Sequence, residues 1–161
     1  MNACSSYYFF SAIIAAGAIL TGFSGTFLQF RIQREANYYR QPVLSYEERK
    51  AVDVFIGLSH FTSSFLLIIV AVLLEIVFGF TLPLLALAGY GCTVIEPKLV
   101  VSGLIAALIF LVGYFCSELV HYGILNRRLL NDKNEWGRHR VLVSVTTILA
   151  IFSSLIVFFW R

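Results

Sequence analysis

The chain has 161 residues, of which 59% are hydrophobic and 13% are charged. Soluble domains usually carry about 25% charged residues, so this composition excludes an ordinary soluble domain and indicates a membrane protein. The net charge of +3 comes from basic and acidic residues that are interleaved along the chain, unlike the clustered basic surface of a nucleic-acid-binding protein. We therefore expect the lipid bilayer, and no nucleic acid, among its partners.

Long runs without charged residues separate two charged segments. A helix needs about 20 mainly apolar residues to span the hydrocarbon core. The runs without charge cover 1–30, 54–74, 76–95, 99–117 and 141–160. No Lys or Arg precedes Arg31, so the first run lacks the basic start of a signal peptide and is expected to be a retained helix.

The sequence predicts an all-α membrane protein of one transmembrane domain, 1–161, in which four helices form an up-down bundle and extend into the cytoplasm. Because Pro83, Gly89 and Gly91 interrupt the run 76–95, we expect an outer loop there and no fifth crossing. In chain order the expected elements are helix 1 at about 7–40, helix 2 at about 46–80, an outer apolar loop at 81–96, helix 3 at about 97–130 and helix 4 at about 133–160.

The basic residues predict an orientation in the membrane. Ten of the twelve Lys and Arg residues fall within segments 31–53 and 123–140. Basic residues in short loops mark the cytoplasmic side. Four crossings then place both segments in the cytoplasm and both termini outside, and we expect the bacterial inner (plasma) membrane.

Helix 1 carries small and polar residues at steps of four and three, a spacing that places them on one face. In lipid, such a face lets helix backbones approach closely. It packs against a helix of the same chain or of a second copy, or it lines the axis of an oligomeric pore. The residues of this small-residue face are Ser11, Ala15, Ala18, Gly22, Gly25 and Gln29.

Basic residues follow at the cytoplasmic ends of helices 1 and 3. Mixed charge in these segments suits a protein partner better than an anionic lipid surface. We expect a cytoplasmic partner surface that contains Arg31, Arg34, Arg40, Arg127 and Arg128.

Glu75 is the most informative ionisable residue in the apolar part of the chain. A carboxyl inside a membrane is costly, so it is expected to face the bundle interior, an aqueous cavity or a partner, where it can exchange a proton. If helix 2 ends early, Glu75 lies among the lipid headgroups instead. Its depth decides between these interpretations.

Three further ionisable residues, His60, Glu118 and His121, lie near the cytoplasmic ends of helices 2 and 3. Glu-x-x-His is half of a carboxylate-bridged di-metal site, but a second such pair is lacking. The three residues form a weak candidate for a mononuclear metal site, and interfacial Glu and His residues more often form hydrogen-bonded pairs. We therefore assign no metal and no cofactor. Cys4 and Cys92 both fall on the outer side and form a candidate disulfide.

Common motifs of catalysis and phosphate binding, GxSxG, HExxH and GxxxxGK[ST], are absent from the sequence, which favours a role other than catalysis. Three functions fit the pattern. The first is a homo-oligomeric channel or transport-like protein with helix 1 at the subunit contact, since one chain has too few polar residues to line a wide pore. The second is a membrane adaptor whose segments 31–53 and 123–140 bind a soluble protein. The third is a small metal or redox subunit.

Overall fold

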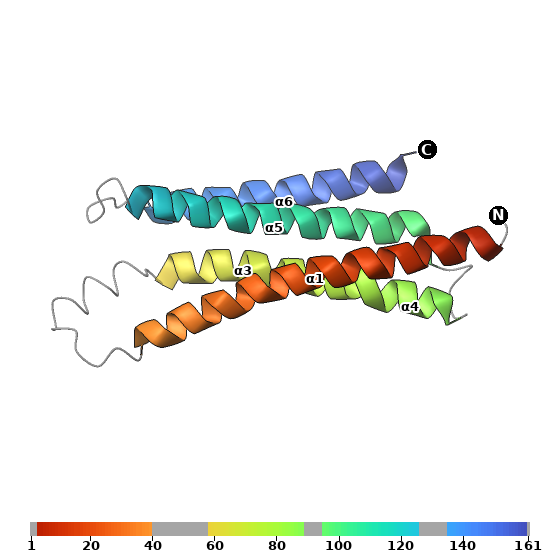
Figure 1. The fold of residues 1–161 in the computed structure, drawn as a ribbon. Helices are drawn as coiled ribbons and strands as arrows, with labels where there is room; N and C mark the ends of the chain where they lie inside the picture. Colours follow the sequence, from red (N-terminus) through yellow and green to blue (C-terminus); the bar gives the residue numbers. More distant parts are fainter. Residues whose placement is uncertain (1–2, 40–57, 89–94, 126–134, 161) are drawn as a thin grey trace.

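The computed structural model describes residues 3–39, 58–88, 95–125 and 135–160, with side chains in 7–33, 64–88, 95–119 and 140–160. Within these ranges the chain forms helices and no strands (Figure 1). The elements are α1 (Ala3–Tyr39), α3 (Leu58–Leu74), the π-helix η1 (Glu75–Thr81), α4 (Leu82–Leu87), α5 (Pro97–Leu125) and α6 (Glu135–Phe159).

Four helical spans in these ranges are long and apolar enough to cross a membrane. The chain is therefore a multi-pass membrane protein, and the predicted all-α fold with four spans is confirmed. The spans are Tyr7–Gln33, Ser64–Leu87, Pro97–Leu119 and Arg140–Phe159.

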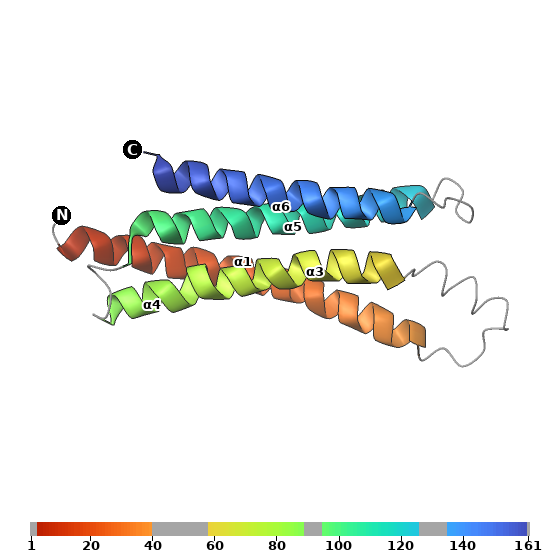
Figure 2. The same ribbon diagram turned by 180° about the vertical axis from the view of Figure 1, so that it is seen from behind.

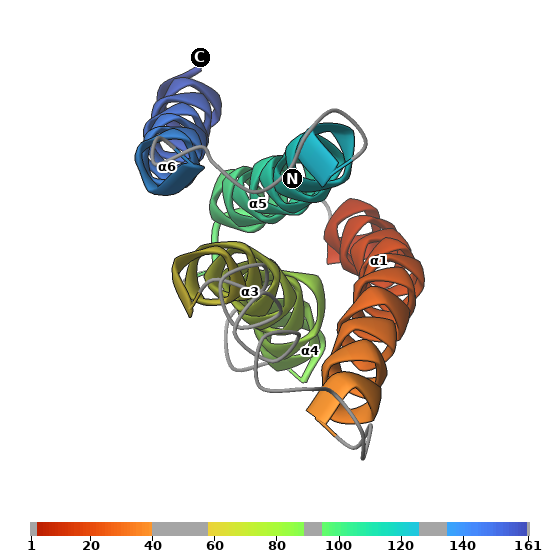
Figure 3. The same ribbon diagram turned by 90° about the vertical axis from the view of Figure 1, so that its left-hand side faces the viewer.

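Helix α5 lies in the middle of the bundle (Figure 3). Helix α6 packs along one side of α5, and the continuous helix formed by α3, η1 and α4 packs along another. Helix α1 lies on the far side of the bundle from α6 and packs mainly against η1 and α4. It crosses them at an angle and diverges from α3 along its second half (Figure 2).

The two ends of the bundle differ. At the loop end, α1 and α5 finish and α3 and α6 begin, whereas Ala3, Phe159 and the start of α5 lie at the opposite, terminal end (Figure 1). The two charged segments of the sequence therefore leave the bundle at the same end, as four crossings require. At the terminal end, α5 begins with Pro97 and the backbone N–H of Leu99 donates to the carbonyl of Glu96 at 3.0 Å. Proline suits this first turn because its missing N–H would have no helical partner there.

The second span does not end where the sequence analysis expected. In place of an outer loop from residue 81, the helix continues through η1 and α4 to Leu87. A proline ring normally clashes with the carbonyl four residues earlier, but the wider π-helix lies directly before Pro83. The backbone N–H of Leu82 donates to Val77 O, and Thr81 Oγ1 donates to Ile76 O at 3.1 Å. Both bonds reach back five residues, which is the π-helix spacing.

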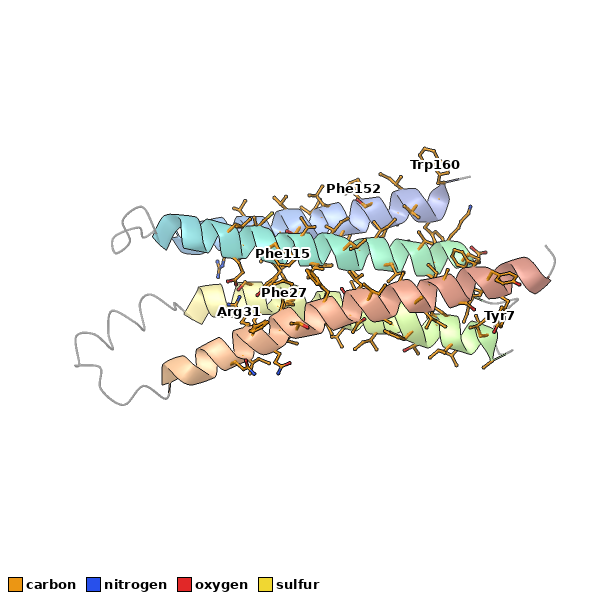
Figure 4. All side chains as sticks on the ribbon, viewed as in Figure 1. Tyr7, Phe27, Arg31, Phe115, Phe152 and Trp160 are labelled. Atoms are coloured by element: carbon orange, nitrogen blue, oxygen red, sulfur yellow. The ribbon has the colours of Figure 1, made fainter. Side chains whose placement is uncertain are left out.

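Clusters of apolar side chains hold the helices together near both ends of the bundle. Phe10, Ala86 and Val100 form a buried cluster that joins α1, α4 and α5. Towards the loop end, Leu67 and Ile68 of α3 pack against Tyr114 of α5. Large apolar side chains on α6, such as Phe152, point outward (Figure 4), as expected for a helix face in contact with lipid.

Candidate functional site

Two carboxylates lie inside the bundle, Glu75 at 0% exposure and Glu118 at 9%. Each is contacted by a buried polar side chain of α1. These two α1 residues, Ser24 and Arg31, are seven positions apart and lie on the same helix face. The polar interior is therefore organised along one face of α1.

Glu75 lies inside the apolar helix that runs from α3 through η1 and α4 to Leu87. The helix continues beyond Glu75 on both sides, so the early helix end on which the headgroup alternative depended is not observed. The hydroxyl of Ser24 donates to Glu75 Oε1 at 2.8 Å, between two fully buried residues. The second carboxyl oxygen, Oε2, is buried and has no hydrogen-bond partner among the described residues.

The backbone around Glu75 is unusual. Glu75 is the first residue of η1, and π-helical segments occur frequently at functional sites. Four residues later, Gly79 faces Gly17 of α1 so closely that a Cβ on Gly17 would lie 2.8 Å from Gly79 Cα. Only two glycines allow this approach, and it brings α1 near enough for the short Ser24 side chain to reach the carboxyl.

The second carboxylate, Glu118, forms a salt bridge with Arg31 Nη1. The Arg31 guanidinium also lies over the ring of Tyr114, with Cζ 5.8 Å from the ring centroid. Phe27 and Phe115 stack edge to face beside this pair, with ring centroids 4.9 Å apart. Figure 4 shows Phe27, Arg31 and Phe115 projecting into the space between α1 and α5.

The structure places Arg31 differently from the sequence analysis, which put it on a cytoplasmic partner surface. The Arg31 residue is 3% exposed, and a charge buried to this degree normally requires a partner of opposite sign. Its pairing with Glu118 disfavours the candidate metal site, because a guanidinium beside a carboxylate repels a metal cation.

The small-residue face of α1 points away from the bundle. Nothing lies within 4 Å of a Cβ built on Gly22 or on Gly25. Ala15, Ala18 and Gln29 are exposed, and Ser11 is partly exposed. Contact of this face with another helix of the same chain is therefore not observed among the described residues.

The face of α1 that does contact the bundle carries Phe10, Gly17, Ser24 and Arg31, all buried. The sequence pattern alone did not predict this line of contacts or its partner Gly79. A signal was present, because these four residues recur every seven positions, as expected of a helix seam. Leu and Phe residues on the other faces of α1 made this seven-residue repeat hard to distinguish from the general apolar pattern.

Several predicted residues lie outside the described side chains, including both members of the candidate disulfide. Within the described residues, no group of three or more His, Cys, Asp and Glu residues could hold a metal ion. The predicted residues whose side chains are not described are Cys4, Arg34, Arg40, His60, Cys92, His121, Arg127 and Arg128.

Comparison with protein-family models, with curated proteins and with solved structures finds no match.

Proposed function

We propose that the protein is a homo-oligomeric channel or transport-like protein in which Glu75 is the ionisable group on the path of the transported ion. One observation carries this proposal. A fully buried carboxyl within an apolar helix has one oxygen bonded to Ser24 and the other without a partner among the described residues. An ionisable residue inside the membrane is by default a candidate for an ion pathway or proton relay.

A packing role alone does not account for Glu75. An interhelical hydrogen bond in a membrane contributes about 0.6–2 kcal/mol, whereas an acidic residue at the centre of a span costs roughly 3 kcal/mol on insertion scales. The Ser24 bond therefore does not offset the cost of the carboxyl. A serine or an alanine at position 75 would pack against α1 with less penalty, so the carboxyl is better explained by ion exchange.

Self-association is the second part of the proposal. The described interior holds few polar side chains, and four of them form two pairs between helices, Ser24 with Glu75 and Arg31 with Glu118. Because α1 carries Ser24 on its inward face and the small residues on its outward face, each Glu75 would lie one helix away from a contact between copies. The small-residue face, unoccupied by the chain's own described side chains at Gly22 and Gly25, suits a close helix contact with a second copy.

Ion flux into proteoliposomes tests the proposal. Vesicles with a potassium diffusion potential are loaded with a pH-sensitive dye or, in parallel, with a sodium-sensitive dye. We expect flux of one ion with the wild type and its loss with Glu75→Gln. Glu96→Gln is the matched control, because it makes the same chemical change at an exposed carboxylate at the start of α5. Absence of wild-type flux, or equal flux with Glu75→Gln, would refute the proposal.

An adaptor role is the second candidate, and one feature favours it. Helix α1 continues to Tyr39, beyond the run without charged residues that ends at Phe30, so it would project from the membrane at the loop end. By the positive-inside rule, this end faces the cytoplasm of a bacterial inner membrane. A soluble protein bound to segments 31–53 and 123–140 would co-purify with the wild type and be lost from Arg34→Glu.

A further inference from the structure

We propose that the ion which Glu75 takes up and releases is a proton and not a metal cation. The inference rests on the proposed function and specifies the ion that its central site handles. Glu75 Oε2 is the atom that carries the proton.

The Ser24 hydroxyl is the one described side-chain oxygen recorded in hydrogen-bond contact with the Glu75 carboxyl. Cations such as Ca²⁺ and Mg²⁺ take six or more oxygen ligands, and a dehydrated potassium ion needs a comparable ring of carbonyls. Glu75 offers its own carboxyl and the Ser24 hydroxyl, and its chain neighbours Leu74 and Ile76 are apolar. A proton needs only one oxygen and neutralises the carboxylate without further ligands.

No described charged group competes for the carboxyl. The described part of α3 and all of α4 carry no charged residue, and His60 lies near the far end of α3. On α1, the nearest cation is Arg31, about 10 Å along the helix from Ser24, and it is held by Glu118 of α5. The other described titratable groups of α5 are Tyr114, which packs beside Arg31, and Lys98 and Cys116, which are exposed.

The Ser24 bond is compatible with both protonation states. Ser24 donates to Oε1, which accepts whether the carboxyl is ionised or neutral. The proton therefore binds at Oε2, the oxygen that lacks a partner. Ser24 acts as a positioning residue, because it fixes which oxygen is left for the proton.

A hydrophobic carbodiimide tests this assignment on the intact protein. Dicyclohexylcarbodiimide dissolves in the membrane and reacts with a protonated carboxyl. The acid O–H adds across one C=N bond, the proton passes to nitrogen, and the O-acylisourea formed rearranges to a stable N-acylurea. Mass spectrometry of the digested protein then measures the modified fraction of Glu75, with Glu96 as an internal comparison.

We expect Glu75 to be labelled, with labelling that is lost as the pH rises and is unchanged by added sodium, potassium or calcium chloride at constant pH. Protection of Glu75 by any of these salts, relative to choline chloride at equal ionic strength, would overturn the inference. Labelling that is absent at every pH would also overturn it. Labelling without flux in proteoliposomes would refute the transport role and leave the proton site standing. Flux combined with salt protection would refute only the proton.

Discussion

The contact between Gly17 and Gly79 predicts that adding one methyl group to α1 destabilises the bundle. In Gly17→Ala the new Cβ would lie 2.8 Å from both Cα and O of Gly79. Non-bonded carbon atoms rest about 3.5–4.0 Å apart. Both partners are backbone, so neither can rotate away, and α1 must separate from η1 by about 1 Å at the crossing.

The energetic effect follows from this displacement. Overpacking of a tight contact costs about 1–3 kcal/mol. Separation of the helices also stretches the 2.8 Å bond from Ser24 to Glu75, and its loss adds about 0.6 kcal/mol. Alanine is a better helix former than glycine by about 1 kcal/mol, which partly offsets the loss.

Gly22→Ala is the matched control for packing within one chain, because a Cβ at Gly22 meets nothing of that chain within 4 Å, and the two variants are compared as monomers in mixed micelles. It makes the same change in the same helix and keeps the benefit in helix propensity. The difference between the two variants therefore isolates the clash, and we expect Gly17→Ala to be less stable than Gly22→Ala by about 2–3 kcal/mol.

Unfolding by sodium dodecyl sulfate in mixed micelles, followed by tryptophan fluorescence and circular dichroism, measures this difference in the free energy of unfolding. If Gly17→Ala proved as stable as Gly22→Ala, α1 would not cross η1 at Gly79, and the packing that brings Ser24 to Glu75 would be refuted.

Three further predictions use the same structure. Arg31→Met should lower the free energy of unfolding by about 3–5 kcal/mol, because it leaves Glu118 buried without a counter-charge. The double variant Arg31→Met with Glu118→Met should recover most of this loss in the same titration. Additive losses from the two substitutions would contradict the buried pair. Tyr8→Cys and Glu96→Cys each introduce a cysteine near the terminal end of the bundle. Both cysteines should react with a membrane-impermeant maleimide from the same side of oriented vesicles. Labelling from opposite sides would contradict four crossings. Gly22→Leu should reduce the oligomer size measured by light scattering in detergent, and a wild type that is strictly monomeric would remove the oligomeric part of the proposal.

Hydropathy and charge alone predicted the four spans and the common end of the two charged segments. These features depend only on local composition, because apolar length and basic loops are properties of single segments. The end of the second span was predicted wrongly, because Pro83 was taken as an interruption. A π-helix accommodates this proline, and no local pattern in the sequence predicts such a widened turn.

The contact face of α1 could not be predicted from the distribution of apolar residues. In water, the apolar face of a helix marks the core, but in lipid both faces of α1 are apolar and the contrast disappears. The outward face is rich in small residues, whereas the inward face carries one glycine, Gly17, at the point where the backbones of α1 and η1 approach most closely. The position of Arg31 was also misjudged, because its partner Glu118 lies 87 residues away in the sequence.

Glu75 was singled out from the sequence, and the structure supplies its burial and its bond to Ser24. Its role in ion exchange stays a prediction. The sequence alone could not distinguish the bundle interior from the headgroup region, because the choice depended on how far the helix continues past Pro83.

In the proposed function, Glu75 exchanges an ion with the aqueous phase. Electrical recording from proteoliposomes adsorbed on a solid-supported membrane tests it most directly, because a rapid pH jump produces a transient current when protons bind and move. The wild type and Glu96→Gln should give this current and Glu75→Gln should not. A current of equal size from Glu75→Gln would contradict the account.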